Sequence, residues 1–304
     1  MSLSFPGVIP AVLTPFDDRH EIDSAKLKAH ADFMIEGGVH GLVAVGTMGE
    51  APSMSRDERQ EVTRIVVDRA GGRVPVLAGV SAPSARQVVE YCADAAEVGV
   101  TGVMLLPPLL YDAHYPELLD FYREVDRGTE LPIMLYNNPK ASGTEDLSAE
   151  TIASLIDDVS GIAAVKECSG DARRIAALQG ADAEILIGGD DWALEGFFAG
   201  STGWVSGVAN VAPRECVRLY EECRAGDIEA ARQTYQALLP LSRLDMTSKL
   251  VQYFKSAALH LGMDLGGCRP PRLALNAVEE AEVAACIKVL ESLASPTAST
   301  GSIA

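Results

Sequence analysis

The sequence is short of positive charge. Its 304 residues hold 25 Lys and Arg against 43 Asp and Glu, a formal net charge of −18 at pH 7. Such a charge repels nucleic-acid phosphates and anionic lipid head groups alike. No apolar run approaches the roughly 20 residues of a membrane-spanning helix, and the opening MSLSFPG lacks the basic and apolar parts of a secretory signal. We therefore expect neither nucleic acid nor a membrane as a partner.

Patterns typical of metal sites and disulfides are also missing. The six cysteines form no C-x-x-C pair, and no two of the five histidines have the spacing of metal ligands. The sequence thus predicts reduced thiols in a cytoplasmic protein without a metal site.

Short apolar runs rich in β-branched residues recur at regular spacing along the chain. Most of them lack the alternation of a half-exposed strand, which is typical of parallel strands covered on both faces. There are eight such runs, at residues 8–15, 41–46, 74–80, 102–107, 132–137, 162–167, 184–189 and 203–208.

Segments with helical periodicity lie between these runs. Ser55 and Glu58 form a capping box at the start of one of them. Other helix starts fall near Asp23, Ser84, Pro116, Ser148, Asp171, Asp191 and Pro213. Eight strands alternating with eight helices over roughly 225 residues fit a closed (β/α)8 TIM barrel, an α/β fold of about 250 residues. The alternative is an open doubly wound sheet, which is disfavoured because no G-x-G-x-x-G turn follows the first run.

The pattern becomes purely helical after the eighth unit, with candidate helices at 227–239, 249–261 and 277–293. We therefore predict a barrel with a C-terminal helical extension. Its divisions are a (β/α)8 catalytic barrel over 1–225, a C-terminal three-helix domain over 226–294 and a disordered tail over 295–304, where the sequence is small and polar.

The functional groups of such a barrel lie at the carboxyl ends of its strands. The sixth run ends in Lys166, beside a packed apolar interior. One interpretation is a strand-end lysine that reaches water or pairs with Glu167. The other is a desolvated amine whose pKa is lowered, so that it attacks a carbonyl and forms a Schiff base.

Two further strand ends carry polar groups. In the turn GTMGE, glycines leave the backbone of Thr47 and its neighbours free to point N–H groups at an anion. Tyr136 ends the fifth run, where a tyrosine either packs or, with Thr47 and Lys166, completes a proton relay. The pair Asp190 and Asp191 is expected to cap the next helix.

These residues resemble the dihydrodipicolinate synthase / N-acetylneuraminate lyase family of class I, Schiff-base aldolases and lyases. The resemblance extends from the VIPAVLTPF segment at 8–16 to RPPRL at 269–273. The motifs that carry it are the GTMGE turn, the YNNP strand end, the VKE lysine, the GGDD turn and the GVANV segment at 207–211.

The resemblance implies a barrel that assembles as a homotetramer, a dimer of dimers, and works with neither a metal nor an organic cofactor. It implies that Lys166 forms the imine, that Tyr136 is the acid/base, and that Thr47 is the relay hydroxyl. It also implies that the backbone N–H groups of Thr47 and Met48 bind the keto-acid carboxylate.

The remaining site residues follow from the resemblance with some departures. Gly189 and Val205 match positions whose backbone carbonyls line the pocket. Ala141 stands where the synthases of the family carry an arginine that grips the second substrate. The paired tyrosine after the fourth strand is replaced by Leu109-Leu110-Tyr111, so Tyr111 serves from a shifted register or the relay ends at Thr47.

The sequence therefore predicts a Schiff-base lyase or aldolase that acts on pyruvate or a longer 2-oxo acid, as a catabolic aldolase, hydrolyase or deaminase. An authentic 4-hydroxy-tetrahydrodipicolinate synthase is the first alternative. A non-catalytic keto-acid-binding sensor is the second. A metal- or phosphate-dependent barrel enzyme is disfavoured, because the sequence offers no ligand cluster and no phosphate loop.

Overall fold

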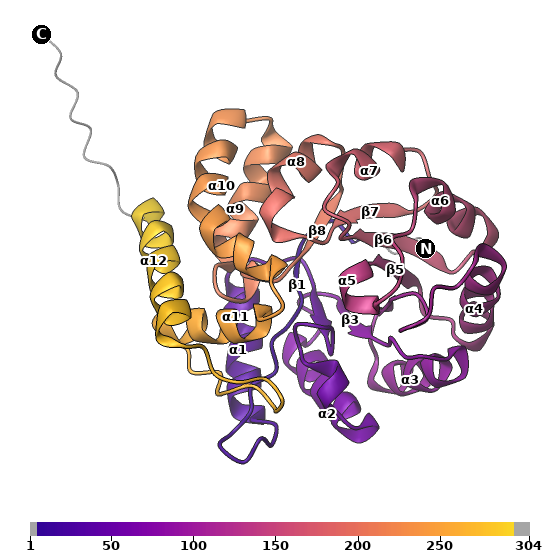
Figure 1. Ribbon diagram of the computed structural model, residues 1–304, viewed down its shortest axis with the longest axis horizontal. Helices are drawn as coiled ribbons and strands as arrows, with labels where there is room; N and C mark the ends of the chain where they lie inside the picture. Colours follow the sequence, from indigo (N-terminus) through magenta and orange to yellow (C-terminus); the bar gives the residue numbers. More distant parts are fainter. Residues whose placement is uncertain (1–4, 295–304) are drawn as a thin grey trace, which may run out of the picture.

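The computed structural model describes residues 5–294 and is built around one parallel sheet of eight strands (Figure 1). The predicted disordered tail at 295–304 lies outside the described residues. The strands are β1 (Gly7–Pro10), β2 (Leu42–Ala44), β3 (Val76–Gly79), β4 (Gly102–Leu105), β5 (Ile133–Asn137), β6 (Ile162–Glu167), β7 (Glu184–Ile187) and β8 (Gly203–Ser206). Each overlaps one of the predicted apolar runs.

The sheet closes on itself. Its strand order is β1-β8-β7-β6-β5-β4-β3-β2, and a parallel bridge between Ala11 and Val43 joins the two ends. The strand residues are buried almost throughout, because helices cover the outside of the sheet and side chains fill the inside. The predicted (β/α)8 TIM barrel is confirmed.

Helices alternate with the strands and surround them in Figure 1. They are α1 (Ser24–Glu36), α2 (Arg56–Ala70), α3 (Ala85–Val98), α4 (Tyr115–Gly128), α5 (Pro139–Ser142), α6 (Ala149–Asp158), α7 (Ala172–Ala177), α8 (Ala193–Phe198) and α9 (Pro213–Ala225). Ser55 and Glu58 form the predicted capping box at the start of α2. Asp23, Ser84 and Ser148 cap α1, α3 and α6 with their side-chain oxygens. The short helix α5 was not predicted.

Three longer helices follow the barrel, as predicted: α10 (Ile228–Ser242), α11 (Leu250–His260) and α12 (Ala277–Ala294). Helix α10 packs against α9 and α12, and α12 also packs against α11. A short 3-10 turn, η4 (Arg243–Met246), connects α10 to α11. The division into a barrel and a separate helical domain stays a prediction. Within residues 5–294, no helix has the length and apolar character to cross a membrane.

Candidate active site

A cavity of about 550 Å³ lies at the carboxyl ends of the strands. Six residues singled out in the sequence line it together: Thr47, Met48, Tyr136, Ala141, Lys166 and Val205. They come from β2, β5, β6, β8 and the loops that follow, which the barrel brings to one end of the molecule. The C-terminal segments close the opposite wall with Asp245, Ser248 and Arg272, among others.

Lys166 and Tyr136 are neighbours on adjacent strands. The parallel register of β5 and β6 pairs the two residues directly, and Lys166 Nζ lies 4.1 Å from the centre of the Tyr136 ring. Both side chains are buried, at 5% and 4% exposure. The ammonium is therefore held over an aromatic face and away from bulk water, next to a phenol that can exchange a proton with a substrate.

The pKa of Lys166 shifts in the direction opposite to the one expected for a desolvated amine. Burial disfavours its ammonium form, but Tyr136, Cys168 and Asp245 together favour it by more, so the pKa of Lys166 is raised. Burial also raises the pKa of Tyr136 and of Cys168 to about 12. Asp245, with a pKa of about 6, is the most acidic of these three neighbours of the lysine. The amine must lose a proton before it can attack a carbonyl.

The turn after β2 has the shape of an anion site. Val45 and Glu50 adopt left-handed backbone conformations, with φ of 49° and 59°. Within residues 5–294, the backbone N–H groups of Thr47 and Met48 donate to no protein acceptor. Gly49 sits so close to the barrel that a Cβ would lie 3.0 Å from the Val12 carbonyl oxygen. The turn can thus present free donors to a carboxylate.

Glu50 fastens this turn to the C-terminal part of the chain. Its buried carboxylate accepts a hydrogen bond from Lys255 Nζ at 3.0 Å and another from the backbone N–H of Arg269 at 3.1 Å. Lys255 also donates to the Gly267 carbonyl at 2.6 Å. The position of Thr47 and Met48 therefore depends on helix α11 and on the loop that follows it.

Two predicted site residues lie outside the cavity. Gly188, and not Gly189, lines the cavity. Gly189 packs against Trp192 instead, so closely that a Cβ on Gly189 would be 2.3 Å from Trp192 Nε1. Tyr111 is half-exposed, and its hydroxyl donates to Glu117 of α4. Leu110, with a φ of 62°, turns the loop outward just before it. Neither Tyr111 nor Gly189 meets Lys166 within this chain.

Asp245 is one of the site residues that the sequence analysis missed. It lies in η4, and a Cβ on Gly207 would be 2.6 Å from its Oδ1 and 2.5 Å from Met48 Cε. The absence of a side chain at Gly207 therefore lets the carboxyl group approach the end of β8. Burial raises the pKa of Asp245 to about 6, and the charge of Lys166 limits the rise. Its position among ordinary helix-flanking residues gave no signal.

Comparison with known proteins shows which family has this sequence and fold. The sequence profile of the dihydrodipicolinate synthetase family matches residues 4–290. The chain belongs to this family. It is a lyase of the class I, Schiff-base type. It is 36% identical over 276 residues to an uncharacterized DapA-like lyase of Halobacterium salinarum, with 90% of each chain covered. It is also 36% identical over 275 residues to the 4-hydroxy-tetrahydrodipicolinate synthase of Methanopyrus kandleri, covering 89% of this chain and 91% of that one.

Solved structures of family members superpose over nearly the whole chain. The 4-hydroxy-tetrahydrodipicolinate synthase of Methylacidiphilum fumariolicum is 28% identical, with a TM-score of 0.90 over 95% of this chain and 97% of that one. The chloride-inhibited dihydrodipicolinate synthase of Acinetobacter baumannii, solved with pyruvate, is 27% identical, with a TM-score of 0.90 over 95% and 99%. The class I lyase described here thus has the fold of the family throughout residues 5–294.

The GGDD turn of this lyase has a different role from the predicted helix cap. Asp190 accepts hydrogen bonds from Trp204 Nε1 at 2.9 Å and from the backbone N–H groups of Gly207 at 3.2 Å and Val208 at 2.6 Å. Its carboxylate is fully buried and ties the end of β7 to the loop after β8. The prediction was wrong because these N–H groups are closer partners than the first turn of α8, which has no side-chain cap.

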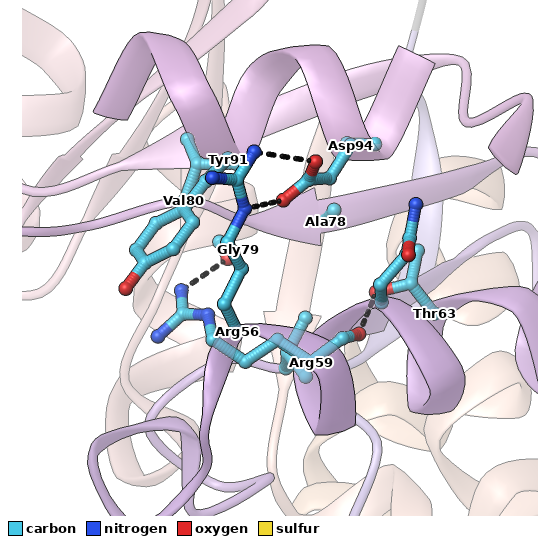
Figure 2. A pocket seen from close by; sticks show the side chains of 11 residues that line it. Arg56, Arg59, Thr63, Ala78, Gly79, Val80, Tyr91 and Asp94 are labelled. Atoms are coloured by element: carbon cyan, nitrogen blue, oxygen red, sulfur yellow. Dashed lines mark hydrogen bonds and ion pairs between the residues drawn. The ribbon is translucent and has the colours of Figure 1, made fainter. Parts of the chain in front are cut away.

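Two other hollows of this family member differ greatly in size. A second cavity of about 320 Å³ adjoins the first and shares Thr47 and Tyr136 with it. Figure 2 shows a hollow of about 20 Å³ beside α2 and α3. There the Arg59 guanidinium donates to the Gly79 carbonyl at 2.9 Å, and Arg56 pairs with Asp94. These groups brace helices and leave room for little more than water. In the described part of the chain, no group of three or more His, Cys, Asp or Glu side chains could hold a metal ion.

Proposed function

We propose that this enzyme binds pyruvate or a longer 2-oxo acid as an imine on Lys166 and acts as a catabolic aldolase, hydrolyase or deaminase. The observation that carries the proposal is the pairing of Lys166 with Tyr136 at one end of the barrel, in a cavity that also contains the free N–H groups of Thr47 and Met48. This combination supplies an amine, an acid/base and an anion site around one ligand.

The first half of the reaction uses these groups in order. The substrate carboxylate accepts hydrogen bonds from the N–H groups of Thr47 and Met48. Lys166, after losing its extra proton, attacks the C2 carbonyl, and the resulting carbinolamine loses water when its hydroxyl is protonated by Tyr136. Thr47 serves as the hydroxyl partner of Tyr136. The product is a positively charged imine at C2, held on the end of β6.

The second half follows from the charge of that imine. In an aldol cleavage, the C4 hydroxyl gives its proton to a base, the C3–C4 bond breaks, and its electron pair moves to C3 to form an enamine. In a dehydration or deamination, a C3 proton is removed and the C4 substituent leaves with a proton supplied by the enzyme. Val205 and Gly188 line the wall beside C2, whereas Gly189 and Tyr111 have no contact that assigns them a step.

Reduction by borohydride tests the proposal directly. The protein is incubated with pyruvate, reduced with borohydride and digested, and the adduct is located by peptide mass. We expect the modified residue to be Lys166, and Lys166→Ala to show no adduct. Lys255 is the matched control, because it is also buried but lies outside the cavity. An adduct on another lysine would refute the proposal.

The synthase reaction is the second candidate function, and the named relatives favour it. Several relatives of 33–36% identity are 4-hydroxy-tetrahydrodipicolinate synthases. Against it stands Ala141, which lines the cavity without a cation. The sensor alternative differs from both, because a sensor would form the imine and release no product. Substrate consumption by unreduced enzyme, measured beside the trapping with 4-hydroxy-2-oxo acids and with pyruvate plus aspartate semialdehyde, separates all three functions.

We further propose that the enzyme is a cytoplasmic homotetramer. All six cysteines are free thiols in the structure, which suits a reducing compartment. Leu110 is 85% exposed and Leu273 and Val278 are each 79% exposed, so apolar side chains are available for contacts between subunits. Light scattering after size-exclusion chromatography is expected to give four times the chain mass of 32.2 kDa. A monomeric mass would contradict this proposal without touching the imine chemistry.

A further inference from the structure

The outer part of the active-site cavity carries charged groups that imine formation does not use. Lys140 reaches it from α5, Arg272 from the loop between α11 and α12, and Asp245 from η4. The three segments are separate in sequence and converge only in the folded chain. The cavity of about 550 Å³ is within the usual range for small-molecule sites and is larger than pyruvate alone requires.

The surroundings of the two cations differ: Lys140 is exposed and lies near the carboxylate of Asp191, whereas Arg272 is only partly exposed. Within residues 5–294, neither Lys140 nor Arg272 forms an ion pair or a side-chain hydrogen bond. In a chain with 43 acidic and 25 basic residues, acidic partners are abundant, and most other arginines of the described chain have one. Two cations without a close carboxylate partner therefore line the same cavity.

The charge balance of the cavity indicates an anion at this end. Its lining holds the cations Lys140, Lys166 and Arg272 and the single carboxylate Asp245. The imine keeps the positive charge of Lys166, and the turn at Thr47 supplies N–H donors for the first carboxylate. With the first carboxylate placed opposite the charge of the imine, Lys140 and Arg272 face only the carboxylate of Asp245. A second anionic group on the ligand is therefore needed to balance their charge.

We propose that Lys140 and Arg272 form a subsite for a second anionic group, and that the substrate is a 2-oxo acid with a hydroxylated chain ending in a carboxylate. This inference rests on the proposed imine chemistry and adds the substrate class. Arg272 offers a bidentate fork to the far carboxylate, and Lys140 adds a point charge. Asp245, which lines the same cavity close to Lys166, accepts the hydrogen of the substrate hydroxyl.

A matched substrate pair tests the subsite. The compounds 4-hydroxy-2-oxoglutarate and 4,5-dihydroxy-2-oxopentanoate have the same chain length and C4 hydroxyl, and differ only in a carboxylate or a hydroxymethyl group at C5. A six-carbon pair, 2-keto-3-deoxyglucarate and 2-keto-3-deoxygluconate, extends the comparison by one carbon. Substrate loss is followed by mass spectrometry, so that cleavage and dehydration both register. We expect kcat/KM to be higher for the diacid of a pair by about 10- to 100-fold.

Variants of Arg272 and Lys140 test whether these two cations cause the preference for the diacid. Arg272→Gln is expected to lower kcat/KM for the diacid by about 10-fold or more and to change the hydroxymethyl partner by less than about threefold. Lys140→Gln is expected to act in the same direction with a smaller effect. Arg232→Gln is the matched control, since it removes an exposed arginine that pairs with Glu229 on α10, outside the cavity. Asp245→Asn is expected to lower kcat/KM by the same factor for both compounds of a pair.

The outcomes separate this inference from the proposed function. Equal kcat/KM values within both pairs, or a preference that survives Arg272→Gln and Lys140→Gln, would overturn the subsite while Lys166 still traps pyruvate. Trapping of pyruvate with no turnover of any of the four compounds would also overturn it. Failure to trap any 2-oxo acid on Lys166 would instead refute the proposed function itself.

Discussion

Lys255 Nζ lies 3.0 Å from Glu50 Oε1, in a fully buried ion pair that joins helix α11 to the turn after β2. The lysine is 5% exposed and the glutamate 0%. The pair holds the backbone of Thr47 and Met48 where the substrate carboxylate is proposed to bind. Its loss is therefore expected to affect both folding and substrate binding.

Lys255→Met leaves the Glu50 carboxylate buried without its cation. We expect it to lower the free energy of unfolding by about 3–5 kcal/mol and to raise KM for the 2-oxo acid. Adding Glu50→Gln should recover part of the stability. Lys26→Met is the control, because its exposed pair with Asp264 is worth less than about 1 kcal/mol. Urea unfolding measures both effects, and equal losses for Lys255→Met and Lys26→Met would contradict this account.

Tyr136→Phe removes the hydroxyl beside Lys166 and leaves the ring that packs over its ammonium. Turnover is expected to fall by roughly 10²–10⁴-fold, the range for a lost proton transfer, while the fold is retained. The measurement is kcat on the best 2-oxo acid found, together with circular dichroism of the variant. An unchanged kcat would show that the proton travels by another route.

Asp245 is expected to make stability depend on pH in an unusual direction. Its folded-state pKa of about 6 lies above the ordinary value of 3.8, so the folded state binds its proton more tightly than the unfolded state does. Above about pH 6 the ionised group thus costs about 3 kcal/mol of stability, and this cost vanishes as the pH falls below about 4. Asp245→Asn should be more stable than the parent near pH 8 and indistinguishable from it near pH 4. A difference that does not change with pH would contradict the assignment.

The synthase reaction is expected to be slow. Ala141 supplies no guanidinium for the carboxylate of aspartate semialdehyde, and the loss of such a pair typically costs about 2–5 kcal/mol when its partner is buried. The assay couples pyruvate and aspartate semialdehyde to dihydrodipicolinate reductase and follows cofactor oxidation. A kcat/KM above about 10⁴ M⁻¹s⁻¹ would identify a synthase in which Ala141 is an inconsequential departure.

The barrel was predictable from sequence because its signals are local. Each strand is a short apolar run that helices must cover on both sides, and Ser55, Ser84 and Ser148 mark helix starts with side-chain oxygens that the structure finds at the caps. Lys166 and Tyr136 were placed together because strand ends in a parallel barrel meet at one face. Strand order and register follow from the same rule.

The outer wall of the site was not predictable in this way. Asp245 and Arg272 lie between C-terminal helices, where no periodicity fixes which side chain faces the barrel. Asp190 was misassigned for a related reason, since its partners at Gly207 and Val208 are 17 and 18 residues away and become neighbours only when β7 and β8 pair. Contacts of this kind depend on the three-dimensional path of the chain.

The two sources of the cavity wall also bear on how such enzymes diversify. The groups proposed for the imine come from the barrel strands, whereas Asp245 and Arg272 come from the segment after residue 226. Mutations in that later segment can alter which carbon chain is accepted while the strand residues keep their positions. A small library of substitutions restricted to η4 and the loop before α12 is thus suited to the selection of variants with new substrate preferences. Because of the same separation, duplicated genes can give enzymes that share the imine-forming step and differ in the substrate they accept.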